Sequence, residues 1–378
     1  MYILVLSQRD IKHPSSGGAE LYLHNALKVA AGKHKIVHLS IRSPRQSKEE
    51  HIDGIHYIRD GKNSLQVIVK GLIYYLRNRK QINLVIDHSN THQFLTFAWA
   101  RRKRVFFIHQ LAQEIGIYFF GPVIGRLVWW CENLLLHLSR GTTITVSQST
   151  RKDLMDKGFR DIYVCPEGNF INNTALPGTS EKEDYLVYVG RLVPYKRVED
   201  ALLLAQKVDR DIKIIGSGPD TYLKRLKKIA AKEGVRAEFL GRLKTEEKNR
   251  IIEKAFLQIM PSIREGWGLV ITESANLGTP SLVYPRPGVI EAVNHGEAGF
   301  LAGDVGVRHL VEAFNRITPE IYSDIRQKSF AYSLEFTWEE TAKCFADIID
   351  SILTRKYGPS PGGATFEQTN TGNIDNLL

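Results

Sequence analysis

The feature that most constrains the fold of this chain is a repeated alternation of short apolar runs with helical patterns. In the first half, the apolar runs are YILVLS, KIVHLSI, NLVIDHS, RVFFIHQ, TTITVSQS and IYVCPEG. They are continuously apolar, which is typical of strands in parallel sheets that are covered on both faces. With helical patterns such as 19–31, 65–79 and 122–138 among them, they predict a doubly wound α/β domain.

The same pattern begins again after a polar stretch, NNTALPGTSEKED, that has the composition of a linker. The second set of runs is YLVYVGRL, IKIIGSG, AEFLGRL, FLQIMPS and PSLVYPR. We therefore predict two Rossmann-like domains that face a cleft, over residues 1–175 and 176–336. A helix over 337–357 is expected to pack back towards the first domain. The Gly-, Pro- and Asn-rich residues 358–378 are expected to be disordered.

Charge is divided unevenly between the two halves. Residues 1–175 contain 24 Lys and Arg against 13 Asp and Glu, whereas residues 176–378 contain 27 against 28. The basic first half indicates an anionic partner, which is a membrane surface, a phosphorylated acceptor or nucleic acid. The cysteines Cys131, Cys165 and Cys344 have no metal-ligand spacing and favour a reducing compartment. We expect no signal peptide and no membrane span, hence a cytoplasmic protein.

Two loops at predicted strand ends carry groups suited to phosphate. In SSGGAE, Gly17 and Gly18 precede a helix, where backbone N–H groups and the helix dipole favour an anion. In GRLVPYKR, a guanidinium at Arg191 and an ammonium at Lys196 can together hold a diphosphate. The alternatives are a capped turn in the first loop and solvated cations in the second.

The stretch IREGWGLVITESANLGTP holds two carboxylates, Glu265 and Glu273. At roughly 100° per residue, a spacing of eight puts them on different faces of one helix, so one of them precedes the helix. A carboxylate accepts two hydrogen bonds and suits the vicinal hydroxyls of a sugar or ribose. Gly266, Trp267 and Gly268 between them allow close backbone approach of a ligand. The alternative is a pair of surface glutamates on a capped helix.

Taken in order, these motifs resemble the family-four glycosyltransferases, which are retaining enzymes of the GT-B architecture that use nucleotide-diphosphate sugars. The glutamate pair followed by ANLGTP is the most specific feature, HGEAGFLA at 295–302 adds to it, and the likeness covers residues 1–350. It implies that a hexose-type sugar is moved from a UDP- or GDP-sugar to a hydroxyl acceptor. The expected acceptor is a glycan or lipid-linked glycan in cell-surface polysaccharide or glycolipid synthesis.

The resemblance also implies roles for the donor-side residues. Glu265 would contact hydroxyls of the donor sugar, and Glu273 would bind the nucleotide ribose. Arg191 and Lys196 would clamp the diphosphate and stabilise its developing charge in place of a divalent cation. No metal or other cofactor is therefore expected. Because no carboxylate nucleophile is evident, we favour same-face attack, with the departing phosphate accepting the acceptor's proton.

In the first domain, the resemblance places the backbone of Gly17 and Gly18 over the phosphates and His109 near the transferred sugar. A histidine after an apolar strand is otherwise more often a satisfied core residue. The family often has Asp where this chain has Gln110, and Asn within the segment written here as PEGN. These departures bear on how the acceptor is positioned.

The basic RRKRVFF and the aromatic IYFFGPVIGRLVWW are expected to meet an anionic membrane surface peripherally. A buried strand and helix with a basic edge is the alternative. Two other functions compete with the transferase. A nucleotide-sugar epimerase shares the architecture and needs no acceptor. A nucleic-acid-binding module explains the charge, but it leaves the glutamate pair unexplained and lacks an aromatic–basic pattern, so no nucleic-acid partner is expected.

Overall fold

The computed structural model describes residues 1–89, 93–171, 173–178 and 182–358. Its first sheet has the strand order β3-β4-β2-β1-β5-β6-β7-β8. All neighbours in it are parallel except β3 and β4. The strands are β1 (Tyr2–Leu6), β2 (Lys35–Ser40), β3 (Glu49–Ile52), β4 (Ile55–Arg59), β5 (Leu84–Ser89), β6 (Arg104–Ile108), β7 (Thr143–Thr145) and β8 (Ile162–Val164).

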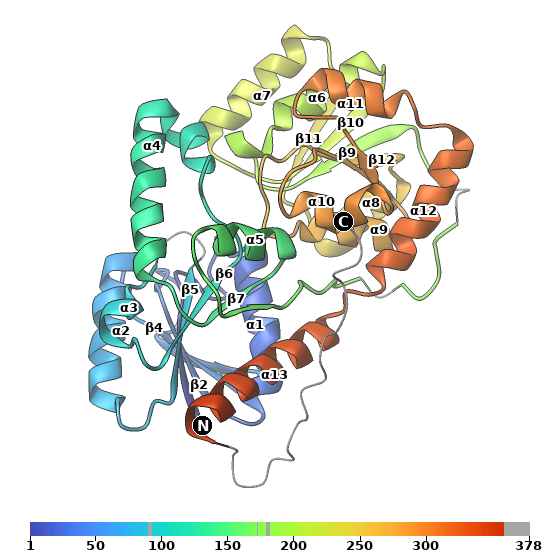
Figure 1. The fold of residues 1–378 in the computed structure, drawn as a ribbon. Helices are drawn as coiled ribbons and strands as arrows, with labels where there is room; N and C mark the ends of the chain where they lie inside the picture. Colours follow the sequence, from blue (N-terminus) through green and yellow to red (C-terminus); the bar gives the residue numbers. More distant parts are fainter. Residues whose placement is uncertain (90–92, 172, 179–181, 359–378) are drawn as a thin grey trace.

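Helices cover both faces of this sheet (Figure 1). They are α1 (Gly18–Ala31), α2 (Ser64–Asn78), α3 (Thr96–Trp99), α4 (Ile115–Leu138) and α5 (Gln148–Asp156). Every residue of β1, β5 and β6 is buried. The predicted doubly wound α/β domain is thus confirmed, because these mostly apolar strands are covered on both faces.

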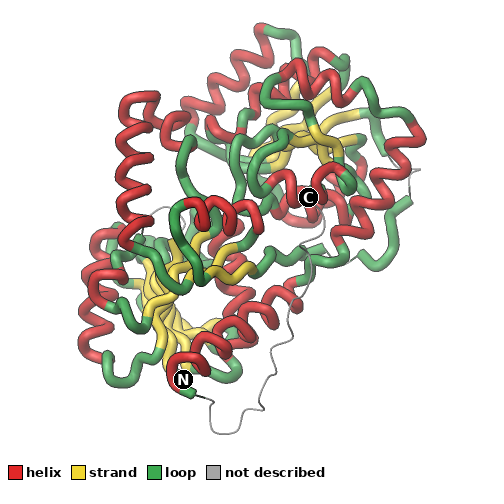
Figure 2. Tube along the Cα trace, viewed as in Figure 1, coloured by secondary structure: helices red, strands yellow, loops and turns green. Residues whose placement is uncertain are grey.

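A second, wholly parallel sheet follows, with the order β11-β10-β9-β12-β13-β14. Its strands are β9 (Tyr185–Val189), β10 (Asp211–Ile215), β11 (Ala237–Gly241), β12 (Leu257–Met260), β13 (Ser281–Val283) and β14 (Phe300–Leu301). The helices are η1 (Pro194–Lys196), α6 (Val198–Lys207), α7 (Asp220–Lys232), α8 (Thr245–Lys254), α9 (Leu269–Asn276), α10 (Val289–Ala292), η2 (Asn294–Gly296), α11 (Val307–Phe314) and α12 (Pro319–Ser333). Figure 2 shows the two sheets as separate yellow layers inside helical shells.

The last helix, α13 (Trp338–Tyr357), crosses back to the first domain and lies along α1 (Figure 1). Phe345 of α13 joins a buried cluster with Tyr22 of α1 and Phe107 of β6. The first domain is therefore completed by residues from the far end of the chain. Part of the expected linker and all but the first residue of the expected disordered tail lie outside the described residues.

Helix α4 is bent into two segments at Gly121, whose φ of 76° breaks the helix, with Pro122 following. The segments pack closely, since a Cβ on Gly125 would lie 2.5 Å from Cα of Ile117. Within the described ranges, no helix is both long and apolar enough to cross a membrane.

Candidate active site

Two neighbouring strands of the second sheet, β9 and β12, are followed by the segments that carry Arg191, Lys196 and the two predicted glutamates. Glu265 lies in the loop after β12, whereas Glu273 lies within α9. Gly268 precedes the helix with a φ of 102°, a conformation that glycine adopts without strain. One carboxylate thus precedes the helix, as the spacing of the pair predicts.

The loop after β9 meets the loop after β12 through a buried ion pair. Nζ of Lys196 contacts Oε1 of Glu265, and both side chains are only 10% exposed. A backbone hydrogen bond of 3.0 Å from N of Ile263 to O of Tyr195 ties the same two loops together. A buried charge is costly unless it is paired, so each of these groups offsets the cost of burying the other.

Arg191 lies beside this ion pair. Its Nη2 donates a hydrogen bond of 2.9 Å to the Tyr195 hydroxyl. Tyr195 first, and then the carboxylates of Glu265 and Glu20, raise the pKa of Arg191. Glu20 belongs to the first turn of α1, so a carboxylate of the first domain acts on the cationic loop of the second. The structure therefore brings Arg191, Lys196 and Glu265 together at the domain boundary.

Glu273 has a different partner. Its Oε2 accepts a hydrogen bond of 2.6 Å from Nζ of Lys248 in α8, and its side chain is 10% exposed. Trp267 is buried and packs against Phe336, with 4.8 Å between ring centroids. Of the predicted donor residues, Glu273 therefore forms an ion pair with Lys248 of α8. Trp267 is part of the hydrophobic core.

The paired glycines lie at the start of α1, where the sequence predicts an anion site. Gly17 is the N-cap residue, and its N–H donates to Oε2 of Glu20 at 2.7 Å. A Cβ on Gly18 would lie 3.2 Å from Cδ1 of Leu269, the first residue of α9. The N-termini of α1 and α9 therefore lie close together at the domain boundary, and the dipole of each helix favours an anion at its N-terminus.

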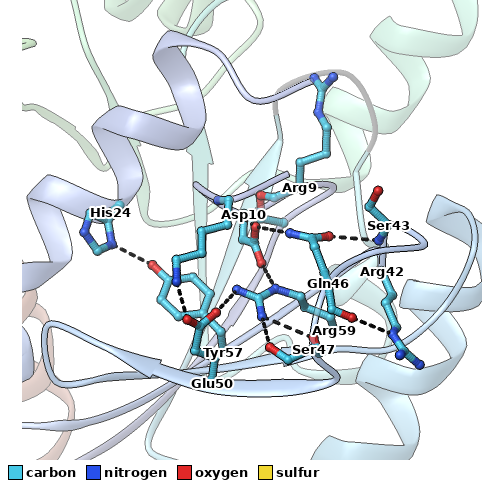
Figure 3. A network of polar contacts seen from close by, with 12 residues as sticks. Arg9, Asp10, His24, Arg42, Ser43, Gln46, Ser47, Glu50, Tyr57 and Arg59 are labelled. Atoms are coloured by element: carbon cyan, nitrogen blue, oxygen red, sulfur yellow. Dashed lines mark hydrogen bonds and ion pairs between the residues drawn. The ribbon is translucent and has the colours of Figure 1, made fainter. Parts of the chain in front are cut away.

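A buried network holds the long loop that leads from β1 to these glycines (Figure 3). Asp10 of the loop is fully buried and forms an ion pair with Nε of Arg59 in β4. Its Oδ1 also accepts from Nε2 of Gln46 at 3.1 Å and from N of Lys12 at 2.9 Å. Glu50 of β3 contacts the other side of the guanidinium, at 2.9 Å from Nη2. The edge hairpin β3–β4, which the sequence analysis does not identify, thus anchors the glycine loop.

His109 directly follows β6, and both of its ring nitrogens have partners inside the first domain. Nδ1 lies 3.0 Å from Oε1 of Glu167, and Nε2 lies 2.9 Å from Nε2 of His88. Burial lowers the pKa of His88 well below its usual value. The His109 carbonyl oxygen would lie 2.8 Å from a Cβ on Gly266. The backbone of His109, rather than its ring, therefore faces the donor loop.

Further contacts join the two domains around this site. Arg264 pairs with Asp153 of α5 and, at 3.3 Å, with Glu114. Glu291 of α10 accepts hydrogen bonds from N of Gln148 and N of Ser149, at 2.7 and 2.5 Å. A carboxylate of the second domain thus caps a helix of the first.

Several partners of the predicted residues are not predicted from the sequence, namely Glu20, Lys248, His88 and Glu167. For Glu20 a signal exists, because GGAE places a carboxylate in the first helical turn, where it can cap its own N-terminus. The other three are paired by contacts distant in sequence, which no local pattern indicates.

Two facing Rossmann-like domains, with a cationic loop and buried carboxylates where their strand ends meet, define the class as a GT-B glycosyltransferase. Residues 16–168 match the family model "Glycosyltransferase Family 4", and residues 172–324 match "Glycosyl transferases group 1". Since the two matches follow each other along most of the chain, the protein belongs to the family-four glycosyltransferases of GT-B architecture.

Individual relatives are distant. A glycosyltransferase of Haemophilus influenzae is 25% identical over 322 residues, which cover 81% of this chain and 83% of the relative. The N-acetyl-α-D-glucosaminyl L-malate synthase of Bacillus anthracis is 28% identical over 33% of each chain.

Solved structures extend the likeness in fold. Sucrose-phosphate synthase from Thermosynechococcus elongatus has a TM-score of 0.78 at 17% identity, over 94% of this chain and 99% of that one. Anabaena HepE, in complex with UDP-glucose, has a TM-score of 0.72 at 18% identity, over 93% and 100%.

Proposed function

We propose that this protein transfers a hexose-type sugar from a UDP- or GDP-sugar to a hydroxyl acceptor with retention of anomeric configuration. The observation that carries the proposal is the convergence of Arg191, Lys196 and Glu265 beside the N-terminus of α1. That the structurally similar HepE binds UDP-glucose supports UDP as the nucleotide.

The bond that breaks joins the donor sugar to the diphosphate. Lys196 supplies a group for the diphosphate, and Glu265 supplies one for the sugar. On donor binding, Lys196 turns to the diphosphate together with Arg191, while the Glu265 carboxylate accepts hydrogen bonds from sugar hydroxyls. As the bond breaks, negative charge grows on the diphosphate, and two cations and two helix N-termini stabilise it. These groups can replace a divalent cation, so transfer proceeds without metal.

Retention follows from attack on the face that the diphosphate leaves. The departing phosphate oxygen accepts the proton of the attacking hydroxyl, and no glycosyl–enzyme intermediate forms. Glu265 serves here as a hydrogen-bond acceptor for the sugar hydroxyls, a role that it takes up when Lys196 turns to the diphosphate. Glu273 binds the ribose, sharing its carboxylate with Lys248.

The acceptor is a glycan or lipid-linked glycan, and the first domain meets the membrane peripherally at its cytoplasmic face. Support comes from the excess positive charge of residues 1–175 and from the large exposed apolar residues of α4, among them Val123, Ile124 and Trp130. Sedimentation with anionic liposomes at low salt tests this part. Absence of co-sedimentation would rule it out.

The transfer itself is tested by product analysis. Purified protein is incubated with UDP- and GDP-hexoses, with and without an alkyl glycoside acceptor, and the products are examined by NMR. We expect nucleotide release that depends on acceptor and an anomeric configuration identical to that of the donor. Glu265→Ala should lower turnover. A changed sugar formed from donor alone would identify an epimerase and overturn the proposal.

A further inference from the structure

A pocket of about 700 Å³ lies in the first domain between α2, α4 and the loop after β6. This volume falls within the range of about 300–1,000 Å³ that is typical of small-molecule sites. Its lining is mostly apolar and includes Ile68 of α2 and Phe119, Leu127 and Leu135 of α4. We call it the apolar pocket.

One end of the apolar pocket reaches the predicted reaction centre. Arg191 and Tyr195 of the second domain line it, and so does Gln110, which directly follows His109. The hydroxyl of Tyr195 accepts a hydrogen bond from Arg191, so this wall of the pocket belongs to the cationic loop. A molecule in the pocket therefore lies beside the place where the diphosphate is expected to leave.

The other end opens towards the exposed apolar side of α4. Leu127 lines the pocket and is itself 60% exposed, and Ile124 and Trp130 on the same helix are similarly exposed. Contiguous apolar surface of this kind is unusual on a monomer and marks an interaction site. An apolar chain can pass from this surface into the pocket without leaving apolar contacts.

Two polar side chains of the pocket, Glu132 and Gln110, differ in their hydrogen bonding. Glu132 accepts hydrogen bonds from N of Ala112 and N of Gln113, so it fixes the loop after β6. In contrast, Oε1 of Gln110 is buried and has no hydrogen-bond partner among the described residues. Leaving a buried acceptor unpaired is unfavourable, and a ligand hydroxyl that donates to it would remove this cost.

We propose that the apolar pocket binds the hydrocarbon chain of an amphiphilic acceptor, and that Gln110 positions the acceptor's hydroxyl head beside Arg191. The proposal rests on the transferase function and narrows the acceptor to molecules that join a hydroxyl-bearing head to an alkyl or prenyl chain. Burial of the chain contributes affinity in proportion to its length.

Cys131 provides a direct reporter, because it lines the pocket and its thiol is exposed, whereas Cys165 is buried. Alkylation of Cys131 by iodoacetamide is followed by mass spectrometry with methyl or octyl glucoside, the latter below its micelle concentration. At ten times its dissociation constant, octyl glucoside should slow alkylation by about tenfold, and methyl glucoside at equal concentration should not. Equal rates with the two glucosides would overturn the proposal.

Two variants of α4 separate the pocket from the surface around it. Leu127→Asp changes a pocket residue, and Ile124→Asp changes an equally exposed residue that does not line the pocket. Protection by octyl glucoside should be lost in the first variant and kept in the second. Equal behaviour of the two variants would contradict a pocket. Thermal stabilisation by UDP, measured on the same samples, reports separately on the proposed function and should be unchanged in both.

Discussion

At the scale of single residues, the two glutamates of the donor loop are distinguished by their partners. Glu265 neutralises a lysine of the neighbouring loop, whereas Glu273 is held by Lys248 from α8. The sequence spacing suffices to place one before the helix and one within it. It contains no information on the two lysines, because ion pairs over 69 and 25 residues depend on strand order.

Glu273→Ala should chiefly weaken nucleotide binding. A hydrogen bond to a charged group contributes about 1.5–3 kcal/mol, so we expect the dissociation constant for UDP, measured by calorimetry, to rise by roughly tenfold or more. Lys248→Met is the matched control, since it removes the partner and leaves the carboxylate. Equal losses in the two variants would show that the ion pair, not the carboxylate, matters.

His38 should make stability depend on pH. Burial lowers its pKa from 6.5 to about 4, with Asp10 opposing the shift and His24 and Arg59 adding to it. The unfolded chain therefore takes up a proton below pH 6.5 that native His38 takes up only near pH 4. Stability should fall by up to about 3 kcal/mol on acidification across this window.

Replacing the buried imidazole of His38 should make the free energy of unfolding depend less on pH in the acidic range. We expect urea unfolding of His38→Leu to vary less between pH 6.5 and 4 than that of the wild type. His137→Leu, at an exposed position, serves as control. An unchanged slope in His38→Leu would show that other groups govern the acid response.

At the scale of elements, continuous apolar runs predict the parallel strands well, because burial on both faces demands them. The hairpin β3–β4 is missed, since the residues of β3 at the sheet edge are exposed or half-buried and those of β4 alternate between buried and half-buried. The turn Asp53–Gly54, with positive φ at both positions, is the local signal for it. The two segments of α4 likewise pack against each other through Gly116 and Gly125. The periodicity of apolar residues along the sequence does not indicate these contacts.

The bend in α4 should depend on Gly125. A Cβ there would lie 2.5 Å from backbone of the facing segment, so Gly125→Ala should destabilise the protein by about 1–3 kcal/mol in urea unfolding. Gly32→Ala is the control, because its Cβ would have only an ordinary contact at 3.4 Å. Similar stability of the two variants would contradict close packing of the α4 segments.

At the scale of the whole molecule, the domains are joined by contacts that cap one domain's helices with the other's side chains. Glu291 satisfies two N–H groups of α5, and Arg264 pairs with Asp153 of the same helix. The sequence carries no signal for such contacts. It therefore predicts a cleft between the two domains, but it does not predict how closely the domains approach each other.

Removing the Glu291 carboxylate should open the molecule. We expect Glu291→Ala to increase the radius of gyration in small-angle X-ray scattering, since two backbone donors lose their partner. Glu297→Ala, an exposed position nearby, should leave it unchanged. A radius unaffected by Glu291→Ala would mean that other contacts hold the domains.

The most direct test of the central claim is calorimetric titration of UDP- and GDP-sugars into the wild type and Lys196→Ala, with the exposed Lys232→Ala as control. If the cationic loop and Glu265 form one donor site, a nucleotide sugar binds the wild type and Lys232→Ala alike. Its dissociation constant then rises by about tenfold or more in Lys196→Ala. Binding that is unaffected by the loss of Lys196, or no binding of any of these sugars, would contradict the assignment.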